Sequence, residues 1–195
     1  MFNYLRSRPS VAVIGQRVTV KKVTIALVSL VSLSVLSFCQ RDPSNRPSPP
    51  AQAQCKLPDG KTITVDYSSP RMKGRQIFGG LVPYNEVWRT GANKATTFVT
   101  TANLTAEGTS VPAGAYTIFT VPGQDNWKLI LNKHTGQWGI PYHYESEELA
   151  RIPMQVSKTS APVENMTISF NQSGNSCALQ VSWENTQASV KFAEK

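Results

Sequence analysis

The residues best suited to chemistry are basic side chains interleaved with aromatic ones between Ser68 and Asn93, in the segment SSPRMKGRQIFGGLVPYNEVWRTGAN. Guanidinium and ammonium groups bind anions through charge-assisted hydrogen bonds, and aromatic faces stack on sugars or cations. The pattern favours a binding site for a small polar or anionic ligand, a glycan or a protein partner. The structural alternative is a long loop in which Trp88 and Phe78 plug one end of the fold and Arg89 satisfies carbonyl groups. The candidate ligand-binding residues here are Arg71, Lys73, Trp88, Arg89 and Asn93.

A second aromatic cluster, GQWGIPYHY, occupies residues 136–144. Trp138 stands between two glycines there, and an exposed tryptophan on a loop can serve as a stacking platform. Trp138 therefore joins the candidate ligand-binding residues. The alternative is a loop that folds back on the core.

A metal site is conceivable from the two histidines, His134 and His143, together with Glu145 or Glu147. The sequence has no His-Glu-x-x-His and no Cys-x-x-Cys motif, and two histidines on surface loops explain the pattern as well. We therefore expect no metal and no other cofactor.

Catalysis has weaker support in the sequence. It contains neither a Gly-x-Ser-x-Gly elbow nor a glycine-rich phosphate loop. A hydrolase acting on envelope glycans would need paired acid–base groups, for which Asp66, Glu86 and His134 are the candidates. The sequence favours a non-catalytic module over such an enzyme, and a purely structural or assembly domain is the third hypothesis.

Three glycine- and tryptophan-bearing runs occur in order: IFGGLVPYNEVWRTGANKATTF, VPAGAYTIFTVPG and LNKHTGQWG. They resemble the bacterial family catalogued as domain of unknown function 2911, over about Val65 to Phe170. The resemblance implies an exported protein, often with a lipoprotein-type signal, and implies no activity. If the family shares a site, the matching positions in this chain are Arg71, Lys73, Gly74, Trp88, Arg89, Thr90, Gly91, Asn93 and Trp138.

Short alternating runs separated by turn residues must position these side chains. Strands are expected at Lys61–Tyr67, Thr96–Thr101, Ala115–Val121, Trp127–Asn132, Ile152–Lys158, Asn165–Asn171, Cys177–Glu184 and Ala188–Ala193. Such spacing predicts an all-β domain over residues 55–195, an antiparallel β-sandwich of jelly-roll or immunoglobulin-like type. The last three runs predict a meander with a tight turn at Asn185-Thr186. Glu145–Arg151 is the one short helix expected.

The N-terminal third looks like an export signal and a tether. Residues 1–38 carry five basic residues, no acidic ones, and an uncharged run from Val23 to Phe38. Residues 39–54 are proline-rich and are expected to be a tether. The chain has 20 Lys and Arg against 12 Asp and Glu, a net charge of +8, of which +3 remains after residue 38. That balance argues against a nucleic-acid partner.

Cys39 follows the apolar run in Leu36-Ser37-Phe38-Cys39, which resembles the lipobox of bacterial lipoproteins. We expect lipidation at Cys39, with cleavage after Ala53 or an uncleaved anchor as alternatives. Position 40, directly after Cys39, is Gln and not the Asp that resembles an inner-membrane retention signal. The outer membrane is therefore favoured, with the domain in the periplasm. Each alternative places the domain outside the cytoplasm.

Cys55 and Cys177 remain as a pair. Disulfides persist in an oxidising compartment, so we expect a bridge between them; two unrelated buried thiols are the alternative.

Overall fold

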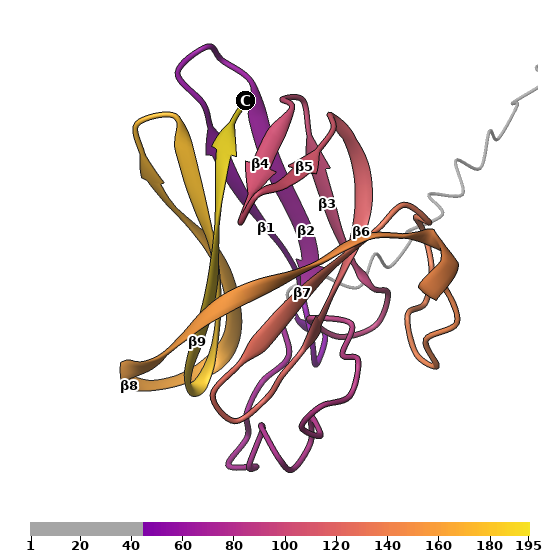
Figure 1. Cartoon of the computed structure of the whole chain (residues 1–195). Coiled ribbons are helices and arrows are strands. Elements are labelled where there is room, and N and C mark those ends of the chain that lie inside the picture. The colour runs from indigo at the N-terminus through magenta and orange to yellow at the C-terminus, as the bar shows by residue number, and fades with distance from the viewer. Residues whose placement is uncertain (1–44) are drawn as a thin grey trace, which may run out of the picture. The chain divides into compact units, whose positions relative to one another are not determined.

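Alternating apolar and polar residues form nine strands in the part of the chain that the computed structural model describes, residues 45–195. The strands make one antiparallel sheet in the order β1-β2-β3-β6-β7-β8-β9-β4-β5 (Figure 1), and the sheet does not close. Their bounds are β1 Pro50–Lys56, β2 Thr62–Ser68, β3 Thr96–Thr100, β4 Leu104–Ala106, β5 Thr109–Val111, β6 Gly114–Val121, β7 Trp127–Asn132, β8 Glu148–Ser173 and β9 Ser176–Glu194.

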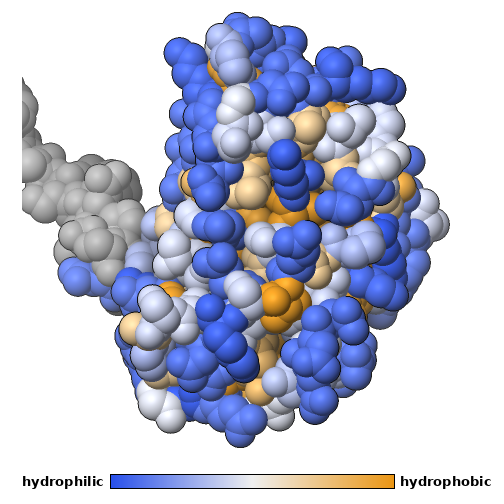
Figure 2. Space-filling model, turned by 60° about the vertical axis from the view of Figure 1, so that its left-hand side comes forward, coloured by the Kyte–Doolittle hydropathy of each residue, from blue (hydrophilic) through white to orange (hydrophobic). Residues whose placement is uncertain are grey.

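The alternation places one side of the strands in a common core. Ile63 and Val65 of β2 are fully buried, as are Phe98 of β3 and Leu179 of β9. Burial of such side chains removes apolar surface from water, which is the main favourable contribution to folding. On the outside, the face seen in Figure 2 is mostly hydrophilic, and hydrophobic side chains reach it only between polar ones.

The two longest strands curl the sheet. The first residues of β8 pair with β7, and the rest of β8 pairs with β9, so one strand serves both parts of the sheet. The Tyr67 hydroxyl of β2 accepts a hydrogen bond from the Ile168 N–H of β8, at 3.1 Å. Cys55 of β1 is disulfide-bonded to Cys177 of β9, with 6.3 Å between the Cα atoms. The β1–β2 end of the sheet therefore lies against β8 and β9.

The all-β class and the disulfide are confirmed, whereas the jelly-roll or immunoglobulin-like assignment stays a prediction. A disulfide of this kind suggests an oxidising, extracytoplasmic compartment. Within residues 45–195, no helix has the length and apolar character needed to cross a membrane. The predicted signal and the lipidation site Cys39 lie outside the described residues.

The tight turn predicted at Asn185-Thr186 is wrong. Both runs on either side of it belong to the single strand β9. The chain bends there without reversing, because Glu184 takes a left-handed backbone conformation, with φ of 54°, and the pairing with β8 shifts between Lys158 and Val163. Such an irregularity bends a strand while its direction continues.

The helix predicted for Glu145–Arg151 is correct only for its first turn. A 3₁₀ helix, η2, covers Glu145–Glu147, and β8 begins at Glu148. Ala150 and Arg151 instead pair with Leu131 and Ile130 of β7. Sheet pairing overrides the helical preference of these residues.

The sheet begins at Pro50, inside the segment expected to be a tether. Ala51 and Ala53 are half-buried and alternate with exposed residues, and this stretch pairs with β2 as an edge strand.

The β4–β5 hairpin was not predicted. It turns through Glu107-Gly108, both with positive φ, 45° and 77°, as a two-residue hairpin turn requires.

Candidate functional site

The long connection between β2 and β3, residues 69–95, is tied to β8 where it begins. The Ser69 hydroxyl donates a 2.7 Å hydrogen bond to the Met166 carbonyl. The Met72 N–H donates a 2.8 Å hydrogen bond to the Glu164 carbonyl. A connection of this length inside a compact domain is uncommon and often functional.

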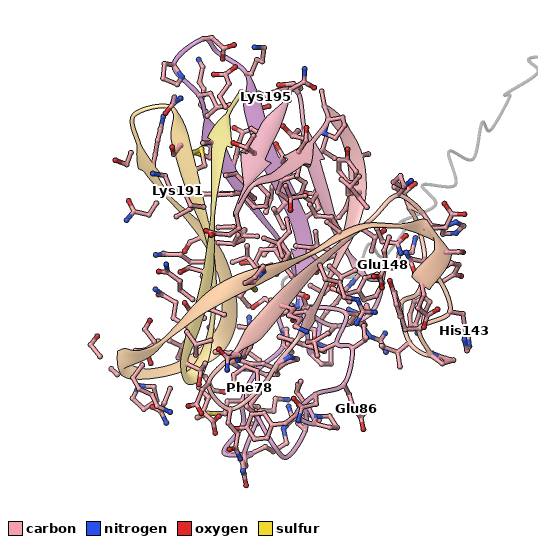
Figure 3. The ribbon with its side chains drawn as sticks, viewed as in Figure 1. Phe78, Glu86, His143, Glu148, Lys191 and Lys195 are labelled. Carbon is pink, nitrogen blue, oxygen red and sulfur yellow. A yellow bond between two sulfur atoms is a disulfide. The ribbon has the colours of Figure 1, made fainter. Side chains whose placement is uncertain are left out.

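Two further attachments hold the middle of this connection. The Glu184 carboxylate, at the bend in β9, accepts hydrogen bonds from the N–H groups of Ile77 and Phe78 at 3.3 and 3.5 Å. Trp88 and Thr120 exchange two backbone hydrogen bonds of 2.8 and 2.9 Å. The connection is thus fixed to both parts of the sheet, at the end opposite Lys195; Figure 3 labels Phe78 and Glu86 there.

A cluster of aromatic side chains lies beneath this connection. Trp88 stacks on Trp183, with ring centroids 5.9 Å apart and planes 19° apart. Phe78 meets the rings of Trp127, Trp88 and Trp183 edge-on, at 4.9, 6.1 and 6.4 Å. Trp88 is 9% exposed, so most of its side chain packs inside the fold, as expected if Trp88 plugs one end of the domain. The cluster gives the loop end of the domain a rigid base.

The backbone at Thr90 is strained. Its φ is 53°, which a β-branched residue rarely adopts. Its hydroxyl hydrogen-bonds the Trp88 carbonyl at 3.3 Å and the Thr120 hydroxyl at 3.1 Å, and its carbonyl accepts from the Thr96 hydroxyl at 2.8 Å. Strain held in this way clusters at binding and catalytic sites. Here it fixes the position of the neighbouring Arg89.

Arg89 joins the connection to a second loop, residues 133–147. Its guanidinium donates to the Asn93 carbonyl and, at 3.5 Å, to the Trp138 carbonyl. The guanidinium carbon also lies 5.8 Å from the centroid of the Trp138 ring, which is a cation–π arrangement. Partial burial lowers the pKa of the Arg89 guanidinium, which still keeps its proton at neutral pH.

The second loop is held at its far end by a polar network. The Tyr142 hydroxyl accepts from the Asn132 amide at 3.0 Å and donates to the Glu148 carboxylate at 2.7 Å. Arg151 forms two 2.8 Å hydrogen bonds with the same carboxylate. Mainly for that reason, the pKa of Glu148 is lowered. The loop that carries Trp138 is therefore fixed at both ends.

Three adjoining hollows open at this end of the domain. The first, of about 460 Å³, has Trp88 and Trp183 among its lining residues, together with Arg75, Arg89 and Glu86. The second, of about 380 Å³, is lined by Arg71, Lys73 and Arg75 among others. The third, of about 610 Å³, lies between Trp138, Lys94 and Arg46. Ser48 lines all three, and Asn93 lines the first and third.

The charges around the hollows are nearly all positive. Glu86 is the single carboxylate among the lining residues of the three, and none of the lining cations forms an ion pair within residues 45–195. The lining cations are Arg46, Arg71, Lys73, Arg75, Arg89 and Lys94. This end of the domain is therefore suited to an anionic ligand.

Each of the six ligand-binding residues expected from the sequence lines one of these hollows. Arg71 and Lys73 border the second hollow, Trp138 the third, and Trp88 contributes to the first from within the aromatic cluster. Other residues that line the hollows were not expected to bind a ligand, among them Arg46, Ser48, Arg75, Leu81, Glu86, Lys94, Ile140 and Trp183. Arg75, Leu81, Glu86 and Ile140 lie in the two segments whose composition indicated a site, whereas Arg46, Ser48, Lys94 and Trp183 lie outside them.

The acid–base candidates are not brought together in these hollows. Asp66 lies on β2 and accepts a 2.7 Å hydrogen bond from the Gln52 amide. His134 stacks on Tyr144, with ring centroids 4.5 Å apart. Of the three candidates, only Glu86 lines a hollow.

The metal ligands considered from the sequence lie on the second loop and on η2, and Figure 3 shows His143 at the outer tip of that loop. Within residues 45–195, no group of three or more His, Cys, Asp or Glu side chains is placed to hold a metal ion.

Adding a single methyl group at Gly139 should disturb the contact between the two loops. Gly139 has φ of 107°, and a Cβ there would lie 3.0 Å from the Ala95 Cβ and 3.1 Å from the Arg89 Cβ. We expect Gly139→Ala to lower the free energy of unfolding by roughly 2–4 kcal/mol, from backbone strain and overpacking together. Gly136→Ala is the matched control, because Gly136 also has positive φ but open space around its Cβ position. Urea denaturation measures both, and equal losses would contradict the packing argument.

Comparison with family models matches residues 48–192 to the family described as "Protein of unknown function (DUF2911)". No curated protein and no solved structure matches the chain. The matched range contains both loops and every strand from β1 to β8, with most of β9.

Proposed function

Since the chain belongs to the DUF2911 family, whose description carries no activity, we propose a function from the loop end itself: the domain is an extracytoplasmic binding module for a small anionic ligand. The ligand would carry a phosphate or carboxylate group. Arginine forks and lysines bind both groups through charge-assisted hydrogen bonds.

The observation that carries this proposal is the excess of cations around the three hollows. Six basic side chains and one carboxylate line them, and the basic ones have no acidic partner within residues 45–195. Like charges gathered at one end repel one another, so an arrangement of this kind is favoured when an anion binds among them. What sets these side chains apart is that they lie together around adjoining hollows, since other lysines of the domain, such as Lys128 and Lys158, also have no ion pair in the described part of the chain.

The rigidity of the loops supports the proposal as well. The strained backbone at Thr90, next to Arg89, is held by hydrogen bonds of the Thr90 hydroxyl and carbonyl groups, and the aromatic cluster supports the first hollow from below. Binding groups held in place before a ligand arrives lose little conformational entropy when it binds.

We further propose that the two parts of the curled sheet act as the layers of a β-sandwich that carries these loops.

The proposal includes the envelope. We propose that the N-terminal signal directs export and that Cys39 carries a lipid, with the outer membrane as its site in a Gram-negative cell. The sequence before the domain supports this, and the disulfide suggests the same compartment.

The test is thermal unfolding of the full-length protein in a neutral detergent, with inorganic phosphate, glycerol phosphate and a uronic acid as probes. A probe at about one hundred times its dissociation constant should stabilise the wild type by about 2.7 kcal/mol. We expect Arg89→Ala and Lys94→Ala to reduce this stabilisation. Lys158→Ala is the matched control for charge, since the exposed Lys158 on β8 lines none of the hollows.

Stabilisation that Lys158→Ala weakens as much as Lys94→Ala would reveal nonspecific charge screening and would count against the site. No stabilisation by any of the probes would count against binding of small anions altogether.

A further inference from the structure

Three large apolar side chains are exposed among residues 45–195, and all three border the hollows. Leu81 is 47% exposed, Trp138 60% and Ile140 37%. Leu81 and Ile140 line the first hollow, and Trp138 lines the third. Because large exposed apolar groups that gather on one surface mark a contact with another molecule or a membrane, this end of the domain is an interaction surface.

Contacts of the backbone at Trp138 and Gly139 hold the Trp138 side chain in its exposed position. The Trp138 carbonyl is bound by Arg89, and the following residue, Gly139, packs against Ala95 and Phe119. The indole is therefore presented to solvent by a fixed loop. Tryptophan, with one polar N–H and a large apolar face, is enriched at the interface of a bilayer with water, as tyrosine is.

The chain enters the domain on this same surface. Ser48 lines all three hollows, and its carbonyl accepts a 3.4 Å hydrogen bond from the Asn93 amide. The next carbonyl, of Pro49, accepts a 2.9 Å hydrogen bond from the Ser69 N–H. The path along the chain from Cys39 to Asn45 spans about 20 Å at full extension. An anchor at Cys39 would therefore keep the point where the chain enters the domain, which lies on this surface, within a short distance of the membrane.

The charges around the exposed apolar groups complement an anionic bilayer. Arg46 and Lys94 line the same hollow as Trp138, while the single lining carboxylate, Glu86, lies in the first hollow. Basic residues close to a membrane are attracted to anionic headgroups, and this attraction weakens with added salt. Basic groups around an exposed tryptophan thus fit the phosphate layer and the region just beneath it.

We propose that the loop end docks on the membrane that carries the anchor, with Trp138, Leu81 and Ile140 entering the interface and the surrounding cations binding anionic headgroups. This inference rests on the proposed function, since the headgroup phosphate is the anion that the hollows would bind. A free phosphate ester offers the same chemistry without a bilayer. The docking proposal commits to the lipid surface.

The test uses the position of the tryptophans. The chain has four, and Trp88, Trp127 and Trp183 are buried, so a quencher in the bilayer reports on Trp138. Full-length protein is reconstituted in vesicles of phosphatidylcholine and phosphatidylglycerol whose acyl chains are brominated close to the glycerol. We expect fluorescence quenching in these vesicles, and its loss in Trp138→Phe.

Paired charge reversals separate docking from anchoring. Arg46→Glu with Lys94→Glu should largely abolish the quenching while the protein stays in the vesicle fraction through its anchor. Lys128→Glu with Lys158→Glu, two exposed residues that line none of the hollows, should leave quenching unchanged. Vesicles of phosphatidylcholine alone should give little quenching.

An absence of bromine quenching, with Trp138 still open to acrylamide in the aqueous phase, would overturn the docking proposal. If Arg89-dependent stabilisation by soluble phosphate esters persisted in that case, the proposed function would stand without docking. If neither bromine quenching nor stabilisation by phosphate esters were seen, both the docking proposal and the proposed function would be wrong. Equal quenching in neutral and anionic vesicles would overturn the headgroup recognition.

Discussion

Reduction of the Cys55–Cys177 disulfide is expected to lower the free energy of unfolding by about 5 kcal/mol on the chain-entropy model. The bridge joins residues 122 positions apart, from β1 at one edge of the sheet to β9. A cross-link over so long a segment strongly restricts the unfolded chain. Since small domains have a total stability of about 5–15 kcal/mol, the reduced protein should lose roughly a third or more of its stability.

Guanidinium denaturation of oxidised and reduced protein measures this difference. The double variant Cys55→Ala with Cys177→Ala should resemble the reduced wild type and should not respond to reductant. Cys39→Ala is the matched control, because it removes the remaining cysteine and leaves the bridge intact. A midpoint that reductant leaves unchanged would show that the disulfide contributes no stability.

Truncation of Trp183 should have the second large effect. The side chain is 1% exposed, stacks on Trp88, and donates a 3.3 Å hydrogen bond from its indole N–H to the Glu164 carbonyl. Trp183→Ala leaves a large cavity under the loops, and such changes cost about 3–5 kcal/mol. Because Trp183 also lines the first hollow, the variant should lose anion-dependent stabilisation as well.

Trp138→Ala is the control of the same chemical change. With 60% of its surface exposed, Trp138 should alter the free energy of unfolding by only about 0.5 kcal/mol. Chemical denaturation of both variants gives the comparison. Similar losses for the two would mean that the aromatic cluster does not support the loop end.

Local patterns were sufficient for most strands. Alternation of apolar and polar residues identified β2, β3, β6 and β7 nearly to the residue, and the same rule found both parts of β8 and of β9. What the pattern missed depends on partners far away in sequence. Pro50–Lys56 is polar enough to resemble a linker, and it forms a strand because β2 offers an unpaired edge.

Continuity between strands could not be inferred locally. Asn185-Thr186 has the composition of a turn, but the Glu184 carboxylate is engaged by the N–H groups of Ile77 and Phe78, and the strand continues beyond the bend. That contact joins residues more than 100 positions apart, so no short window of sequence contains it.

The site was predicted in part for a related reason. Basic and aromatic residues crowded into two segments pointed to Arg89 and Trp138, and the fold does bring those two together. Arg46 and Lys94 were missed as neighbours of Trp138, because their proximity follows from how three separate loops meet at one end of the sheet. Local composition can therefore indicate that a site exists, but which residues meet there depends on the fold.

The edge position of β1 has a mechanical consequence. A pull on the N-terminal chain would separate β1 from β2 one pair at a time, beginning with Pro50 and Ser68. Peeling of this kind breaks hydrogen bonds in sequence and needs little force, but it would stop at Cys55, whose covalent bond to β9 carries the tension onward. Under tension on its N-terminal chain, the domain would thus yield by a few residues and then hold, because the disulfide protects the rest of the fold.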